Sequence, residues 1–190
     1  MADTLKGKKI AILVADGFEQ SEFQKPKQAL EDAGAETKVV SPAGSKVKGW
    51  NHTEWGEEVK VDIPLKSVKA EDFDGLHLPG GVMNPDHLRM DPQAVAFVKH
   101  FFESGKPVSA ICHASWTMIE ADVVRGRTIT SWPSLKTDLL NAGAHWVDQE
   151  VVRDKNLVSS RKPDDLPAFN REIVALFAEG GSGVTQKKVA

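Results

Sequence analysis

Residues 9–17 read KIAILVADG, and this stretch decides the fold class. After Lys9 the run is apolar without alternation, which is typical of a strand buried on both faces, as the strands of parallel sheets are. Asp16-Gly17 then ends the run with a turn signal. The sequence therefore predicts a buried strand of a parallel sheet near the N-terminus.

A helix and a second strand follow and complete a strand–helix–strand unit. The helix predicted at residues 21–33 has an apolar stripe at helical spacing, made of Phe23, Pro26, Ala29 and Leu30. It ends before Gly34, a residue suited to a helix C-cap. The segment ETKVVS at residues 36–41, closed by Pro42, predicts the second strand.

The rest of the chain continues this alternation. Further helices are predicted at residues 92–104, 113–122, 134–142 and 163–177. Further strands are predicted at residues 75–78, 107–111, 128–130, 146–147, 151–152 and 157–158, and residues 43–65 indicate a hairpin or an edge excursion. The pattern predicts an α/β fold whose mainly parallel sheet has helices on both faces and binds ligands outside the carboxyl ends of its strands.

The composition indicates one soluble domain. With 190 residues, of which 41% are hydrophobic, the chain can bury one substantial core. We expect a single domain at residues 1–179 and a flexible, glycine-rich tail at residues 180–190. The net charge of −3 provides no basic stripe for phosphates, so we expect no nucleic-acid partner.

The N-terminal segment and the cysteine count bear on the compartment. A single cysteine cannot form an internal disulfide, which favours a reducing compartment. The N-terminus lacks the basic region and long apolar run of a signal peptide, and no stretch has the length of a membrane span. We therefore expect a cytoplasmic protein with no membrane partner.

Cys112 is the first candidate for chemistry. It lies where the predicted strand at residues 107–111 turns into a helix, so its sulfur is expected above the sheet, near helix N–H groups that favour the thiolate. Such a strand–turn–helix arrangement resembles a nucleophile elbow. A lone buried cysteine is also an ordinary inert core residue, and its position alone leaves both readings open.

Three neighbouring features could assist this thiol. His113 could act as a base or orienting group, or could simply begin the helix. Glu19 could hydrogen-bond to the sulfur or exchange protons with a substrate, or could be an acid favoured at a helix N-terminus. Gly80 and Gly81 could supply backbone N–H groups to a developing oxyanion, or could form only a tight turn.

Taken together and in order, several segments resemble the DJ-1/PfpI superfamily, nearest its branch of PfpI-type intracellular proteases and general stress proteins. The resemblance covers almost the whole chain. The segments that carry it are ADGFE at residues 15–19, DGLHLPGG at 74–81, NPD at 84–86, AICH at 110–113, RGR at 125–127, NAGA at 141–144 and PDDLPAF at 163–169.

The resemblance implies a flavodoxin-like three-layer sandwich with Cys112 as nucleophile and Glu19 hydrogen-bonded to its sulfur. Gly81 and His113 would contribute the N–H groups of an oxyanion hole. It also implies a homodimer or a higher homo-oligomer, in which Asp86 of a neighbouring subunit orients His113. From the residues alone, Asn84-Pro85-Asp86 is only a turn whose acid could cap the next helix.

Two positions depart from the family pattern. Ala114, followed by Ser115 and Trp116, stands where the family commonly has glycine after the histidine, and we expect Ala114 and Trp116 to add bulk at the substrate-binding mouth. Val82 stands where many relatives have arginine, which removes a possible anion contact. Trp132, in the loop after a predicted strand, is a further candidate for lining the site.

Neither a metal nor a cofactor is expected. The histidines outside the site lack metal-ligand spacing and there is no second cysteine. The turn after the first strand has one glycine and two acids, Asp16 and Glu19, which would repel the phosphates of a nucleotide.

The leading functional hypothesis is a cofactor-independent stress-response enzyme of the glyoxalase III or deglycase kind. Its substrates would be small α-oxo-aldehydes, or the early glycation adducts that these form with proteins and nucleotides. One alternative is a PfpI-type cysteine peptidase. Another is a redox-sensing stress protein or holdase chaperone that uses an oxidisable Cys112.

Overall fold

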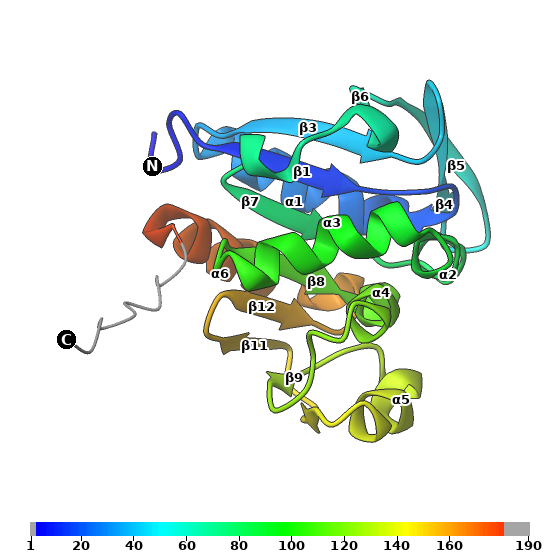
Figure 1. The fold of residues 1–190 in the computed structure, drawn as a ribbon, viewed down its shortest axis with the longest axis vertical. Coiled ribbons are helices and arrows are strands. Elements are labelled where there is room, and N and C mark those ends of the chain that lie inside the picture. The colour runs from blue at the N-terminus through cyan, green and yellow to red at the C-terminus, as the bar shows by residue number, and fades with distance from the viewer. Residues whose placement is uncertain (1–2, 181–190) are drawn as a thin grey trace.

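The computed structural model describes residues 3–180, and a seven-stranded sheet forms its centre (Figure 1). The strand order is β11-β12-β8-β7-β1-β3-β6. The bounds are β1 (Lys9–Leu13), β3 (Glu36–Ser41), β6 (Ile63–Pro64), β7 (Gly75–Leu78), β8 (Val108–Ile111), β11 (Val151–Asp154) and β12 (Leu157–Ser160). Every neighbouring pair is parallel except β11 with β12, which confirms the predicted mainly parallel sheet.

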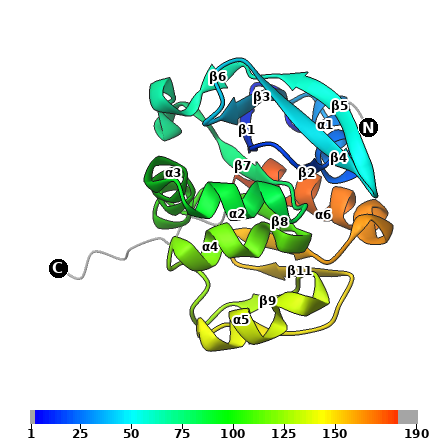
Figure 2. The same cartoon turned by 90° about the vertical axis from the view of Figure 1, so that its right-hand side faces the viewer.

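Helices cover both faces of the sheet, as predicted. On one face α1 (Gln20–Asp32) packs against α6 (Leu166–Glu179). On the other face α2 (Met83–Arg89), α3 (Pro92–Glu103) and α4 (Ser115–Glu120) pack together. Figure 2 looks onto the carboxyl ends of the central strands, with α3 on one side of the sheet and α6 on the other. The fold is therefore a three-layer α/β sandwich.

Smaller elements complete the described part of the chain. Helix α5 (Lys136–Asn141) packs beside a short parallel pair, β9 (Thr128–Ile129) with β10 (His145–Trp146). Five single 3-10 turns are η1 (Leu65–Ser67), η2 (Ala70–Asp72), η3 (Cys112–Ala114), η4 (Pro133–Leu135) and η5 (Pro163–Asp165).

The alternation of side chains along the central strands builds an apolar core on each face of the sheet. In β1, Ala11 and Leu13 belong to the cluster under α3, whereas Ile10 belongs to the cluster under α1 and α6. In β7, Leu76 and Leu78 also face α3 and are almost fully buried. Because side chains alternate along a strand, His77 between them points to the α1 side.

The excursion at residues 43–65 is a hairpin, as predicted. Strands β4 (Lys46–Asn51) and β5 (Glu54–Lys60) pair antiparallel, and β4 also pairs with the short β2 (Phe18–Glu19) that leads into α1. Trp50 and Trp55 lie opposite each other on the hairpin, with their ring centroids 5.4 Å apart in an edge-to-face arrangement. The hairpin thus stands beside the turn at which β1 ends.

Residues 84–86 correct one prediction. Asn84-Pro85-Asp86 is not a turn but lies within α2, where proline is tolerated because it falls in the first turn. The cap of the next helix is Asp91, whose side chain accepts hydrogen bonds from the N–H groups of Gln93 and Ala94.

Two other predictions concern the ends of the chain and the membrane. Residues 181–190, which make up nearly all of the predicted tail, lie outside the described residues. No helix between residues 3 and 180 has the length and apolarity needed to span a bilayer.

Candidate active site

Cys112 follows β8 directly and has a backbone conformation that few side chains adopt. Ile111 is extended, with φ −133°, whereas Cys112 has φ +63°, in the left-handed region. Such a conformation costs free energy in a residue other than glycine and persists where the surrounding structure imposes it. The chain then enters η3 and α4, so the predicted strand–turn–helix elbow is present.

The carboxyl group beside the sulfur belongs to Glu22, not to Glu19. Glu22 lies in the first turn of α1, is fully buried, and is close enough to Cys112 for each group to shift the pKa of the other. The Gly80 N–H donates to Glu22 Oε2 at 3.0 Å. Glu22 Oε1 is buried and has no hydrogen-bond partner of ordinary geometry among the described residues.

Burial keeps this carboxyl group protonated at neutral pH. Loss of solvent, followed by the nearby Glu19 charge, raises the pKa of Glu22 from 4.5 to about 8, although the hydrogen bonds from Cys112, Gly80 and Gly81 oppose the rise. Because Oε2 accepts the Gly80 N–H, the proton is expected on the unpartnered Oε1. The site therefore contains a neutral acid with a donor that faces no protein acceptor.

Glu19 was predicted to hydrogen-bond with the Cys112 sulfur, and this prediction was wrong. Glu19 lies at the end of β2, before α1 begins, and its carboxylate accepts a hydrogen bond from the Ser21 hydroxyl at 3.2 Å. It lines the same pocket as Cys112, but the acid that shifts the pKa of the Cys112 thiol is Glu22.

The sequence contained a signal for Glu22. The predicted helix buries Phe23, Pro26 and Leu30, and Glu22 lies four residues before Pro26 on the same stripe. An acid on the buried stripe of a helix is a candidate for a perturbed pKa.

His113 lies beside the sulfur, as expected. Its Nδ1 is 3.1 Å from Cys112 Sγ, and its ring lies between Trp132, stacked at 5.9 Å, and Trp116, edge-on at 5.1 Å. Burial lowers the pKa of His113 from 6.5 to about 4, so the imidazole is neutral at physiological pH. A neutral ring nitrogen at this distance can accept the thiol proton.

The backbone N–H groups of His113 and Gly81 act to lower the pKa of Cys112. Burial, followed by the Glu22 charge, acts in the opposite direction and raises this pKa well above its ordinary value. The expectation that helix N–H groups favour a resting thiolate is therefore not met. At neutral pH the site holds a thiol, a carboxylic acid and a neutral imidazole.

Gly80 and Gly81 allow the backbone to pass closer to its neighbours in the site than a residue with a side chain could. A Cβ on Gly80 would lie 2.5 Å from Glu22 Oε2 and 2.6 Å from Cys112 Cβ. Gly81 has φ +79°, and a Cβ there would collide with the carbonyl oxygen of Gly17. Both positions are thus restricted to glycine by the packing of the site itself.

A pocket of about 490 Å³ opens above the sulfur. Cys112, His113, Glu22, Glu19, Gly81 and Val82 line one part of it. The rest is formed by Trp50 and His52 of the hairpin, by Trp132, and by Lys162-Pro163-Asp164 before α6. The hairpin residues and Lys162 were not predicted, because nothing in their local sequence indicates that they approach the end of β8.

Three predicted substrate-binding residues lie away from the pocket wall. Gly80 is buried behind Glu22. Ala114 is buried in the core under α3, because the η3 turn directs it inward. Trp116 contacts His113, and its indole N–H donates to Asp138 at 2.9 Å. Ala114 therefore adds no bulk at the mouth, and Trp116 supports the histidine from behind.

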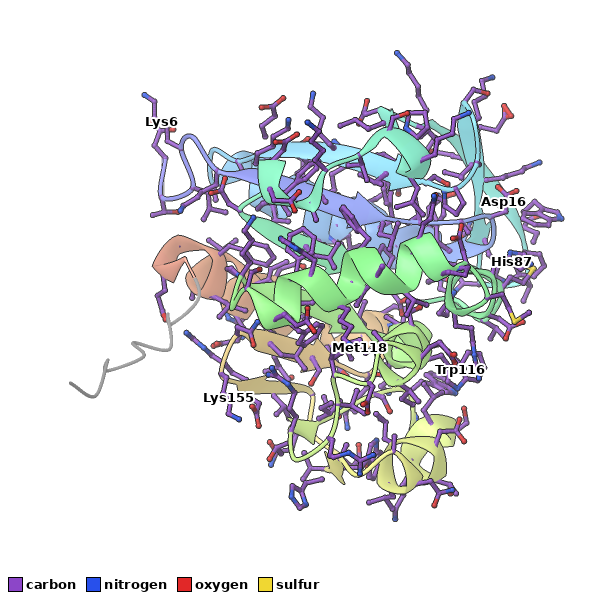
Figure 3. All side chains as sticks on the ribbon, in the orientation of Figure 1. Lys6, Asp16, His87, Trp116, Met118 and Lys155 are labelled. Carbon is purple, nitrogen blue, oxygen red and sulfur yellow. The ribbon has the colours of Figure 1, made fainter. Side chains whose placement is uncertain are left out.

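Asp86 is exposed on α2 and does not contact His113 within the chain. Figure 3 shows its neighbour His87, together with Trp116 and Asp16, at the edge of the molecule where β1 ends.

Between residues 3 and 180 no group of three histidine, cysteine or acidic side chains is arranged to hold a metal ion.

The sequence has close relatives. YraA of Bacillus subtilis (strain 168), which carries the name "Putative cysteine protease YraA", is 46% identical over 171 residues, covering 90% of this chain and 98% of that protein. An uncharacterized protein of Staphylococcus aureus (strain Mu50) is 47% identical over 170 residues, covering 88% of this chain and 96% of that protein.

Solved structures share the fold and the family. DJ-1beta of Drosophila melanogaster superposes with a TM-score of 0.81 and 29% identity over 90% of both chains. A protein of Anabaena variabilis with DJ-1/ThiJ/PfpI-like and ferritin-like domains gives a TM-score of 0.83 and 37% identity over 88% of this chain, which spans 49% of that one. The DJ-1/PfpI family model matches residues 8–176, and the chain belongs to this family.

Proposed function

We propose that the protein is a cofactor-independent, cysteine-dependent enzyme that converts small α-oxo-aldehydes to 2-hydroxy acids. The observation that carries the proposal is one pocket containing Cys112, a protonated Glu22 and a neutral His113. Two titratable groups whose pKa values are driven in opposite directions provide an acid and a base at the same pH. Isomerisation of an aldehyde needs both.

The first step is addition of the thiol to the aldehyde carbon. A bond forms between Cys112 Sγ and that carbon while the thiol proton passes to His113 Nδ1, 3.1 Å away. The aldehyde oxygen takes the proton of Glu22, and the N–H groups of Gly81 and His113 stabilise its developing charge. The product is a hemithioacetal, and Glu22 becomes a carboxylate.

The second step moves a hydrogen from the aldehyde carbon to the neighbouring carbon. The Glu22 carboxylate removes the hydrogen as a proton, and His113 protonates the neighbouring keto oxygen, which gives an enediol. Glu22 then returns its proton to the neighbouring carbon while His113 takes the proton of the first hydroxyl group. A thioester of a 2-hydroxy acid results, and no electrons leave the substrate.

Water completes the cycle by hydrolysing the thioester. Its oxygen bonds to the acyl carbon, the carbon–sulfur bond breaks and the sulfur recovers a proton. The 2-hydroxy acid leaves, and proton transfer from His113 to Glu22 restores the starting site. A pocket of about 490 Å³ has room for a three-carbon aldehyde or for a glycated side chain.

We further propose that subunits associate and that Asp86 of one subunit orients His113 of another. Asp86 is exposed, and Val82 and Met90 near it expose 55% and 80% of their surface. Exposed apolar side chains around an acidic residue favour an interface over free solvent.

A cysteine peptidase is the second candidate, and the name given to YraA of Bacillus subtilis favours it. The buried acid of the site distinguishes the two. Amide hydrolysis does not require a group that removes a carbon-bound proton, whereas aldehyde isomerisation does.

Product identification tests the proposal. Lactate formed from methylglyoxal is measured for the wild type and for Cys112→Ser, alongside cleavage of a fluorescent casein. Many lactate molecules per wild-type subunit and none above background for Cys112→Ser are expected. Casein cleavage dependent on Cys112, without lactate, would overturn the proposal in favour of the peptidase. Neither product, together with stoichiometric oxidation of Cys112, would favour the redox sensor.

A further inference from the structure

Pro26 leaves the backbone carbonyl of Glu22 without its helical donor. In an α-helix the N–H of residue i+4 donates to the carbonyl of residue i, so residue 26 should serve Glu22. Proline has no N–H, and Pro26 is the seventh residue of α1, in the helix interior. Glu22 is fully buried, so water cannot take the place of the missing donor.

His77 supplies the missing hydrogen bond from the sheet. Its Nε2 lies 2.9 Å from the Glu22 carbonyl oxygen, which can only accept, so Nε2 must carry the proton. Its Nδ1 lies 3.0 Å from the Ser109 hydroxyl, which in the neutral imidazole donates to it. His77 of β7 and Ser109 of β8 are direct partners in the register of the two strands.

These contacts fix both the side-chain carboxyl group and the backbone carbonyl of Glu22. The carboxyl accepts the Gly80 N–H, and the carbonyl accepts the His77 N–H. Gly80 follows β7 by two residues, so both donors come from the same strand and its turn. The first turn of α1 is thereby fixed relative to the end of the sheet where Cys112 lies.

We propose that His77 is a positioning residue, which donates to the Glu22 carbonyl and so directs the Glu22 carboxyl group at Cys112. Ser109 assists by fixing the imidazole tautomer. The inference concerns the Cys112–Glu22 pair and rests on the proposed function only for its effect on turnover. Apart from Glu22, the titratable groups that line the pocket around Cys112 are Glu19, His113, Lys162, Asp164 and His52.

Four variants separate positioning from simple packing. His77→Leu removes the donor and keeps an apolar side chain in the core, whereas His77→Gln keeps an N–H at a similar reach. Pro26→Ala restores the N–H of residue 26, so His77→Leu combined with Pro26→Ala gives the Glu22 carbonyl a donor from its own helix. His100→Leu, which changes a partly buried histidine of α3, is the matched control.

The main readout is the pH dependence of Cys112 alkylation by iodoacetamide, because it reports the thiol whatever the substrate is. Glu22 raises the pKa of Cys112, so a displaced Glu22 lowers the midpoint. We expect a fall of about one pH unit in His77→Leu. We expect wild-type midpoints in His77→Gln, in the double variant and in His100→Leu. Lactate formation should fall by about 10- to 100-fold in His77→Leu and in none of the other variants.

An unchanged midpoint in His77→Leu, or a lowered midpoint that Pro26→Ala does not restore, overturns the inference. If His77→Leu does not fold, Ser109→Ala decides: a lowered midpoint supports the inference and an unchanged one overturns it. If no variant or wild type forms lactate while the midpoints follow the expected pattern, the proposed function fails and the positioning role stands.

Discussion

Replacing Glu22 with glutamine should change how the stability of the protein depends on pH. Glu22 has a folded-state pKa of about 8 against 4.5 for an ordinary glutamate, because it is buried. A pKa raised on folding gives stability that is fully present below pH 4.5 and is lost as the pH rises through about 8. The difference between the two pKa values corresponds to about 5 kcal/mol as an upper limit.

Urea unfolding at pH 5 and pH 9 measures this effect. The wild type should lose up to about 5 kcal/mol more than Glu22→Gln between the two pH values. Glutamine has the same shape and still accepts the Gly80 N–H, so the comparison isolates the charge. Glu19→Gln is the matched control and should lose almost as much stability as the wild type, because burial raises the pKa of Glu22 more than the Glu19 charge does. Equal losses in the wild type and Glu22→Gln would refute the assignment of a buried, protonated Glu22.

Three further predictions concern the neighbours of Glu22. His113→Gln should lower kcat for lactate formation by about 10²–10⁴-fold while iodoacetamide still alkylates Cys112; a wild-type kcat would exclude His113 as the base. Gly80→Ala should destabilise the fold by about 1–3 kcal/mol in urea unfolding, because its Cβ would lie 2.6 Å from Cys112 Cβ; wild-type stability would show that the turn adapts. His77 and His113 have pKa values lowered to about 4, so stability that they contribute above pH 6.5 should be lost as the pH falls toward 4. Urea unfolding of His77→Gln should lack part of that acid loss, and a full loss would contradict the buried neutral imidazole.

Much of the fold could be predicted because its strands are short apolar runs followed by turn residues. The apolar runs at residues 9–14 and before Cys112 predicted strands of the central sheet, and the apolar stripes at helical spacing predicted the helices that cover it. The predicted turn at residues 84–86 failed because local turn propensity at Asn84-Pro85-Asp86 competes with packing of α2 against α4, which no local pattern reports.

The site was less predictable than the fold. Cys112 and His113 are neighbours in sequence, so predicting the strand-to-helix turn at residue 112 was enough to place both in the site. The choice between Glu19 and Glu22 depends on which side of the first helical turn faces the sheet, and a family resemblance at residues 15–19 pointed to the wrong acid. Ala114 is directed inward by a single 3-10 turn, a change of direction that the sequence does not reveal.

The most direct test of the account compares lactate formation from methylglyoxal by Glu22→Gln and Glu19→Gln. Both variants keep the size of the side chain, and only the first removes the buried acid that shifts the pKa of Cys112. We expect Glu22→Gln to lower kcat/KM by about 10²–10⁴-fold and Glu19→Gln to keep most of the activity. Loss of activity in Glu19→Gln with wild-type activity in Glu22→Gln would contradict this expectation.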